Sequence, residues 1–180
     1  MSTTTYISDP VTLGTGLLLA RLILGGLMVA HSGQKLFGWL GGYGIAGTAG
    51  YFEQLGFRPG RFFVITASLS EAASGILIAL GLLGPIGPAL LLPVMIVAAI
   101  SVHWKNGLFA TANGIEVPLL YATGAIALAF TGYGPFAFDA ALGIEHVWTP
   151  EFKAAALALG VVGGVVNLLA RRPAQVAAAA

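Results

Sequence analysis

Long apolar runs, each close to the length of a membrane-spanning helix, constrain this chain more than any other feature. A helix needs about 20 mostly apolar residues to cross the hydrocarbon core of a bilayer. Five runs reach or approach that length, and they cover residues 13–37, 62–83, 86–104, 117–134 and 154–170. Because backbone groups in lipid must be satisfied within the segment, each run is predicted to be a helix. The last run is the shortest of the five.

The composition predicts what surrounds these helices. Hydrophobic residues make up 57% of the chain and charged residues only 8%, whereas a soluble domain carries about 25% charged residues. The outer surface must therefore face lipid. We predict an all-α integral membrane bundle of four core transmembrane helices plus a fifth, C-terminal helix. The net charge of +1 gives no reason to expect nucleic acid as a partner.

The runs also suggest how the chain is divided. We expect a polar N-terminal tail over residues 1–12, without the basic start of a cleaved signal peptide. A four-helix membrane domain follows over residues 13–142, then a connecting loop and fifth transmembrane helix over 143–172, and a disordered tail over 173–180. The segment 38–61 is rich in glycine and aromatic residues, and it is predicted to be re-entrant or to lie at the membrane interface.

Basic residues predict the orientation of the bundle. With five spans, six of the lysines and arginines outside the membrane fall on one side, and only Lys153 falls on the other; the six are Lys35, Arg58, Arg61, Lys105, Arg171 and Arg172. Lysine and arginine concentrate on the cytoplasmic side of membrane proteins. We therefore expect a multi-pass protein of the cytoplasmic membrane, with the N-terminus outside and the C-terminus in the cytoplasm.

Two charged residues lie deep within the first two runs. Arg21 is about 12 Å from the outer end of its run, and Glu71 is about 13 Å from the inner end of the next, at the rise of a helix. Antiparallel helices would bring both to a similar depth. We predict an intramembrane ion pair between Arg21 and Glu71 that fixes how the two helices align. Two opposite charges that neutralise each other are explained by their structural role, so no catalytic role is inferred for them.

A second group of ionisable residues lies near the predicted cytoplasmic ends of three runs. These residues are His31, Lys35, His103 and Glu116, and together they form a candidate polar pocket. Each of them alone is typical of an interfacial side chain that reaches toward water. Their spacing is not that of a metal site, so no metal is predicted. No catalytic residue is assigned, and the absence of cysteine excludes thiol chemistry and cysteine-bound clusters.

Several of these positions resemble the DoxX family of small bacterial membrane proteins. The resemblance covers roughly residues 14–142, and most of it lies in spaced polar and glycine positions: Arg21, His31–Leu36, Tyr51–Phe52, Gly56–Pro59, Glu71–Gly75, Gly81–Leu82, His103, Gly107, Phe109, Gly114, Glu116, Gly132–Gly134 and Asp139. The chain departs from the family pattern at Ser32, where glycine is usual. It also has a fifth span where members typically have four.

The resemblance implies a subunit of the bacterial inner membrane that is linked to redox metabolism, since related subunits belong to thiosulfate:quinone oxidoreductases. No cofactor is evident in the sequence itself, and the resemblance points to a quinone. The alternative is a non-catalytic structural or accessory subunit of a larger membrane complex. Its glycine-rich last span (Gly160, Gly163, Gly164) would then pack on a neighbouring membrane subunit. A transporter is the third alternative, weakened by the lack of inverted repeats.

Overall fold

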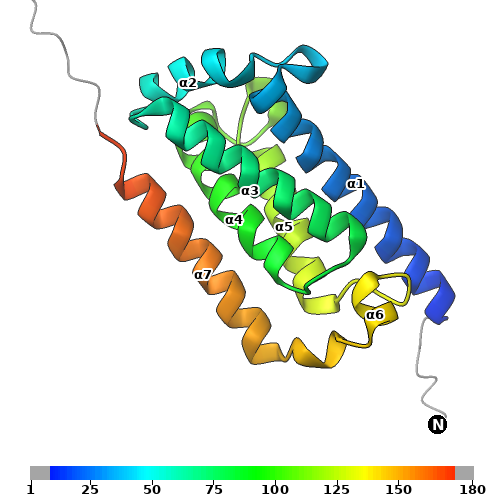
Figure 1. The fold of residues 1–180 in the computed structure, drawn as a ribbon. Coiled ribbons are helices and arrows are strands. Elements are labelled where there is room, and N and C mark those ends of the chain that lie inside the picture. The colour runs from blue at the N-terminus through cyan, green and yellow to red at the C-terminus, as the bar shows by residue number, and fades with distance from the viewer. Residues whose placement is uncertain (1–8, 173–180) are drawn as a thin grey trace, which may run out of the picture.

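The computed structural model describes residues 9–172, which form helices joined by turns and short loops (Figure 1). The helices are α1 (Pro10–Phe37), α2 (Gly44–Gln54), α3 (Gly60–Leu80), α4 (Ile86–Ala98), α5 (Glu116–Thr131), α6 (Phe138–Leu142) and α7 (Pro150–Leu169). Helix α4 continues through a π-helical turn, Ala99–His103, and a 3₁₀ turn, Trp104–Asn106. No strand occurs in the described part of the chain, so the predicted all-α fold is confirmed.

In the described part of the chain, four helices are long and apolar enough to cross a membrane: α1, α3, α4 with its continuation to Asn106, and α7. Helix α5 is shorter, with 16 residues. The last run, although the shortest in the sequence, therefore forms a helix of spanning length. Thr149 caps α7 by accepting a hydrogen bond from the Phe152 amide, and Pro150 stands in its first turn, so α7 begins four residues early and reaches 20 residues.

The first helix also begins earlier than predicted. The Asp9 carboxylate accepts a hydrogen bond of 3.0 Å from the Thr12 amide, and Pro10 follows it as the first helical residue. This is a typical helix start, because aspartate satisfies a free amide and proline needs none. The predicted N-terminal tail thus ends at the cap rather than at residue 12. The predicted disordered tail, 173–180, lies outside the described residues.

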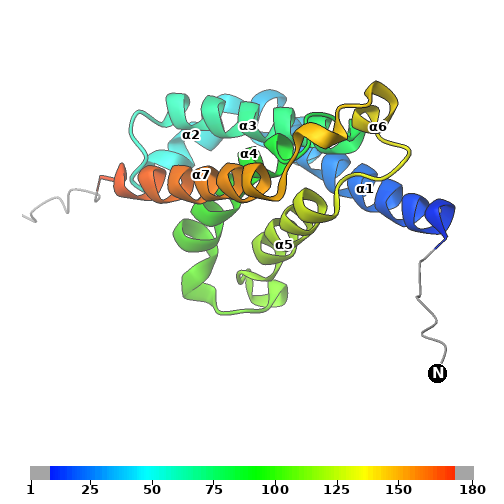
Figure 2. The same cartoon turned by 90° about the horizontal axis from the view of Figure 1, so that it is seen from below.

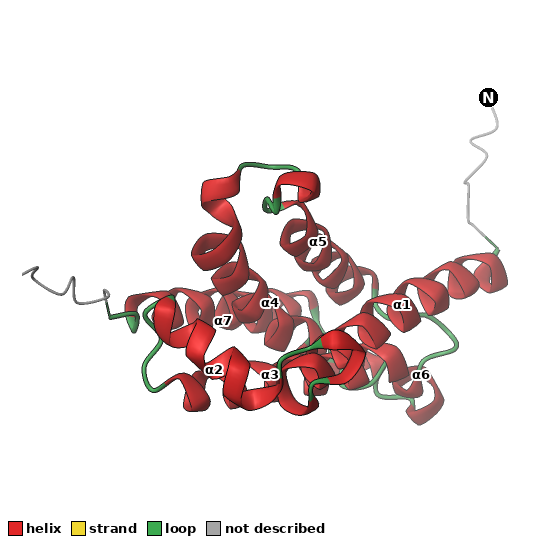
Figure 3. Cartoon of the chain, turned by 90° about the horizontal axis from the view of Figure 1, so that it is seen from above, coloured by secondary structure: helices red, strands yellow, loops and turns green. Residues whose placement is uncertain are grey.

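The helices form a layer with a projecting pair. Helix α3 packs between α1 and α4, and α4 in turn packs on α7, while α5 and the C-terminal part of α4 leave this layer on one side (Figures 1 and 2). Figure 3 shows the same pair rising from the layer, joined by the loop at its tip. A core of apolar side chains, among them Met28, Ile78, Leu91 and Leu128, fills the space between α1, α3, α4 and α5.

Two glycines set the alignment of α1 and α3. A Cβ atom on Gly25 would lie 2.4 Å from the Gly75 carbonyl oxygen, and one on Gly75 would lie 2.6 Å from the Gly25 carbonyl oxygen. Neither position has room for a side chain. The two antiparallel backbones therefore meet at this point, as small residues allow in membrane helices.

Glycines on α7 make the corresponding contact with α4. A Cβ atom on Gly160 would lie 2.6 Å from the carbonyl oxygen of Ala89, and one on Gly164 would lie 3.0 Å from Ile96. Pro93 stands four residues after Ala89 and cannot donate to that carbonyl, so the close approach occurs where α4 lacks a hydrogen bond. The prediction that these glycines pack on a neighbouring subunit is wrong, because they pack within the chain.

The C-terminal end of α7 is attached to the loop between α2 and α3. The Arg171 Nε donates to the Leu55 carbonyl at 2.9 Å, and the Arg172 amide donates to the Gly56 carbonyl at 2.8 Å. The segment 38–61, predicted to be interfacial or re-entrant, contributes α2 to this end of the molecule, and Trp39, Leu40 and Tyr43 are exposed beside it.

Candidate functional site

A cavity of about 550 Å³ lies between the α1–α3 layer and the projecting α4–α5 pair. Side chains from α1, α2, α3, α4 with its π turn, α5 and α7 line it. Most of the wall is apolar or aromatic, and includes Tyr51, Phe52, Leu55, Phe57, Phe63, Val94, Met95, Val97, Val102 and Val117. A cavity of this size with few polar groups is typical of a small-molecule site.

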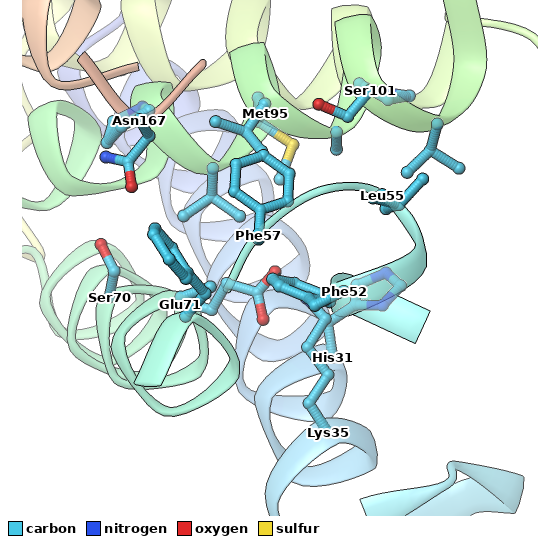
Figure 4. Close-up of a pocket in the computed structure, with 18 of the residues that line it drawn as sticks. His31, Lys35, Phe52, Leu55, Phe57, Ser70, Glu71, Met95, Ser101 and Asn167 are labelled. Atoms are coloured by element: carbon cyan, nitrogen blue, oxygen red, sulfur yellow. The ribbon is translucent and has the colours of Figure 1, made fainter. Parts of the chain in front are cut away.

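The polar centre of the cavity is an ion pair between Lys35 of α1 and Glu71 of α3. The Lys35 ammonium donates to Oε1 of Glu71. Glu71 is 2% exposed, while the Lys35 side chain is 25% exposed. The second carboxylate oxygen, Oε2, is buried and has no protein partner. Figure 4 shows this carboxylate beside Phe52 and below the ring of Phe57.

The predicted ion pair between Arg21 and Glu71 is not formed. The Arg21 guanidinium instead donates to two backbone carbonyls, that of Ala79 at 3.0 Å and that of Phe136. Arg21 lies four residues before Gly25, and Ala79 lies four residues after Gly75, so the glycine contact places them opposite each other. Glu71 precedes Ala79 by eight residues, so it lies about 12 Å from that level, toward the start of α3.

The direction of the side chains explains why Lys35 takes that place. Side chains on a helix lean toward its N-terminus. Because α1 and α3 are antiparallel, the side chains of Lys35 and Glu71 therefore lean toward each other and meet at a depth between their two Cα atoms. Arg21 and Glu71 lean apart. The sequence-based estimate used only the depth of each residue from the end of its apolar run. It took no account of the glycine contact that aligns the helices or of the direction in which the side chains point.

Two histidines reach the cavity from different helices. His31 of α1 meets the ring of Tyr121 edge-on, with 6.0 Å between ring centres. The His103 Nδ1 lies 2.8 Å from the carbonyl oxygen of Asn113. Because a carbonyl can only accept, this Nδ1 carries the hydrogen, and Nε2 of the neutral ring is left as an acceptor.

His103 ends the π-helical turn of α4, which also brings Ser101 and Val102 to the cavity wall. Single π turns in α-helices often occur at functional sites. The Ser101 hydroxyl is buried and has no protein partner. Sequence reasoning missed Ser101 and Tyr121; a tyrosine within the apolar run 117–134 was the available signal for the latter.

Glu116 does not line the cavity, unlike the other three residues of the predicted pocket. Its Oε2 accepts a hydrogen bond of 2.7 Å from the Ala110 amide, and its own amide donates to the Leu108 carbonyl. Glu116 thus closes the loop between the π turn and α5. The structure brings His31, Lys35 and His103 to one cavity, adds Glu71 to them, and leaves Glu116 in the neighbouring loop.

At the opposite end of the bundle, buried Asp139 holds three segments together. Its carboxylate accepts hydrogen bonds from the amides of Leu83 and Gly84 and from the indole of Trp148, at 2.7–2.8 Å. This cluster has its acceptors filled by backbone and indole, so it stabilises the turn between α3 and α4 rather than offering a site.

Within residues 9–172, no group of three or more histidine, aspartate or glutamate side chains is placed to hold a metal ion. The family comparison matches the DoxX model to residues 16–104, which run from α1 through the π-helical turn to Trp104, the first residue of the 3₁₀ turn that continues α4. This chain belongs to the DoxX family. Its spanning helices make it a multi-pass membrane protein of DoxX type. A search of curated proteins and a search of solved structures return no match.

The DoxX match contains most of the charged and histidine groups of the cavity. Lys35, Glu71, His31 and His103 all fall within residues 16–104. The remaining walls, which include Tyr121 on α5 and Asn167 on α7, lie beyond it. The cavity is therefore shared between the DoxX segment and the helices that follow.

Proposed function

We propose that this DoxX protein is a redox-associated subunit of the bacterial cytoplasmic membrane and that its cavity binds the head group of a quinone. The observation that carries the proposal is the cavity itself, with apolar and aromatic walls around one buried carboxylate that has an unoccupied oxygen. Apolar walls suit the ring and the isoprenoid tail, and a small number of polar groups suits the ring oxygens.

The polar groups of the cavity also suit the proton chemistry of quinones, whose reduction takes up protons. The imidazole of His103 is a group that can exchange a proton with a ligand oxygen. The Lys35–Glu71 pair links the buried end of the cavity to a partly exposed side chain. The predicted orientation places this end of the bundle at the cytoplasmic face.

Binding to the purified protein tests this proposal. The protein is reconstituted into lipid nanodiscs, and binding of a decyl-substituted benzoquinone is measured by calorimetry against empty discs. We expect saturable binding that His103→Ala weakens by about tenfold, as expected for loss of one good hydrogen bond. His146→Ala is the matched control, because His146 does not line the cavity and its Nδ1 lies 2.9 Å from the Gly143 carbonyl oxygen.

A role as an accessory subunit is the alternative proposal, and the outer face of α7 favours it. Leu159, Val162, Val166 and Leu169 are exposed on one side of this helix, away from the glycines that contact α4. Such a stripe can face a partner helix as well as lipid. A partner that co-purifies in mild detergent, combined with no quinone binding, would favour this role over the first.

A further inference from the structure

Resting on the proposed function, we infer that the cavity selects the hydroquinone form of its ligand over the quinone. The basis is the kind of hydrogen-bonding group that the cavity offers. Glu71 and His103 both present acceptors without a protein partner. A hydroquinone has two hydroxyl donors, whereas the two ring oxygens of a quinone can only accept.

Glu71 contributes the stronger acceptor. Its Oε1 is bound to the Lys35 ammonium, and its buried Oε2 has no partner among residues 9–172. An ionised carboxylate can only accept hydrogen bonds. A ligand hydroxyl would satisfy this oxygen, and a quinone carbonyl in the same place would bring two acceptors together with no hydrogen between them.

His103 contributes the second acceptor. Its Nδ1 hydrogen is directed at the Asn113 carbonyl, 2.8 Å away, so Nε2 of the neutral ring holds a free lone pair. The Asn113 carbonyl also accepts a hydrogen bond of 3.1 Å from the side-chain amide of Asn106, so both groups donate to it. Donation from a ligand hydroxyl is then the hydrogen bond that the ring can accept.

Most of the other polar groups of the cavity suit either form of the ligand. The hydroxyls of Ser101 and Tyr121 can donate or accept, so they suit both forms of the ligand. His31 has no hydrogen bond within the described residues and can take either role. Lys35 is the exception, because its ammonium donates one hydrogen to Glu71 and keeps two that a quinone oxygen can accept. Its side chain is partly exposed, so water can accept these two hydrogens.

The preference has a measurable redox consequence. Tighter binding of the reduced form makes reduction of the bound quinone more favourable. For a two-electron couple, tenfold tighter binding of the hydroquinone raises the midpoint potential of the bound ligand by about 30 mV. The inference concerns binding alone and needs no electron donor or acceptor in this chain.

Three probes of one shape test the inference in nanodiscs under anaerobic conditions. They are the decyl benzoquinone, its two-electron-reduced hydroquinone, and the dimethyl ether of that hydroquinone, which lacks the donors. We expect the wild type to bind the hydroquinone at least about tenfold more tightly than the other two, the size expected for a hydrogen bond to a charged group. This comparison requires no variant.

Variants then assign the preference to Glu71. In Glu71→Gln, the amide can turn its NH₂ group toward a quinone carbonyl, so the two forms should bind within about threefold of each other. Glu145→Gln, on the exposed 3₁₀ turn at the opposite end, is the matched control and should keep the preference. If Glu71→Gln unfolds, the double variant Lys35→Met/Glu71→Gln removes both charges and should also lose the preference.

The outcomes separate the inference from the proposed function. Equal binding of quinone and hydroquinone by the wild type, or a preference that survives loss of the Glu71 charge, would overturn the inference and leave the quinone site standing. Equal binding of the hydroquinone and its dimethyl ether would also overturn it. Failure of all three probes to bind would refute the proposed function and the inference together.

Discussion

Arg21, Glu71 and Asp139 are all 2% exposed, yet each is neutralised or satisfied by a different kind of group. Arg21 donates to the Phe136 carbonyl and to the Ala79 carbonyl at the end of α3, where the helix dipole favours positive charge. Asp139 accepts from backbone amides and an indole. Of these three residues, only Glu71 is paired with a charged side chain, and only Glu71 has a carboxylate oxygen without a protein partner.

Double-mutant cycles should detect this difference. Removing one member of a buried pair leaves the other uncompensated, so Lys35→Met and Glu71→Gln should be coupled by about 1 kcal/mol in the free energy of unfolding. Arg21→Met and Glu71→Gln should be additive within about 0.5 kcal/mol, because they do not touch. Unfolding in mixed detergent, followed by circular dichroism, gives the energies. Stronger coupling of Glu71 to Arg21 than to Lys35 would contradict the structure.

At the residue scale, the sequence indicates which residues stand out but not which groups they contact. Charged and histidine residues near span ends stand out in an apolar chain, and His31, Lys35 and His103 line one cavity. Glu71 was assigned the wrong partner, and Glu116 the wrong surroundings, because both depend on how helices and loops meet. The hydrogen bond from the Ala110 amide to the Glu116 carboxylate depends on the conformation of the loop, which the sequence does not indicate.

Among the elements, the helices followed from the sequence while their alignment did not. Length and apolarity are properties of one segment, so each predicted run became a helix. The contact between Gly25 and Gly75 joins segments 50 residues apart, and nothing in the sequence pairs these two of the 26 glycines. The same limit explains why the glycines of α7 were assigned to another subunit.

Two neighbouring glycines on α1 allow this contact to be tested. A Cβ atom on Gly25 would clash with the Gly75 carbonyl, whereas one on Gly26 would meet nothing within 4 Å. Gly25→Ala should therefore lower the free energy of unfolding by about 1–3 kcal/mol, the usual cost of overpacking. Gly26→Ala should be neutral or stabilising by up to about 1 kcal/mol, from helix propensity.

The same detergent unfolding measurement applies to both variants. Equal stability of Gly25→Ala and Gly26→Ala would show that α1 and α3 do not meet at this glycine. The pairing of Arg21 with the end of α3 would then lose its explanation as well.

At the scale of the whole molecule, the orientation in the membrane remains a prediction from the basic residues. The lack of cysteine makes it directly testable. In intact spheroplasts, a membrane-impermeant maleimide should label Glu145→Cys, on the predicted outer side, and should label Lys105→Cys only after the membrane is permeabilised. Both positions are exposed. The reverse pattern would place the cavity's Lys35 end outside the cell.

The position of Asp139 has a consequence for how the family is delimited. The DoxX match ends at residue 104, yet Asp139 binds the backbone of residues 83 and 84, and Phe136 accepts a hydrogen bond from Arg21. A protein cut at the end of the match would expose these buried amides and the guanidinium to lipid, where unsatisfied polar groups cost several kcal/mol each. The limit of recognisable sequence similarity is therefore not a limit of independent folding.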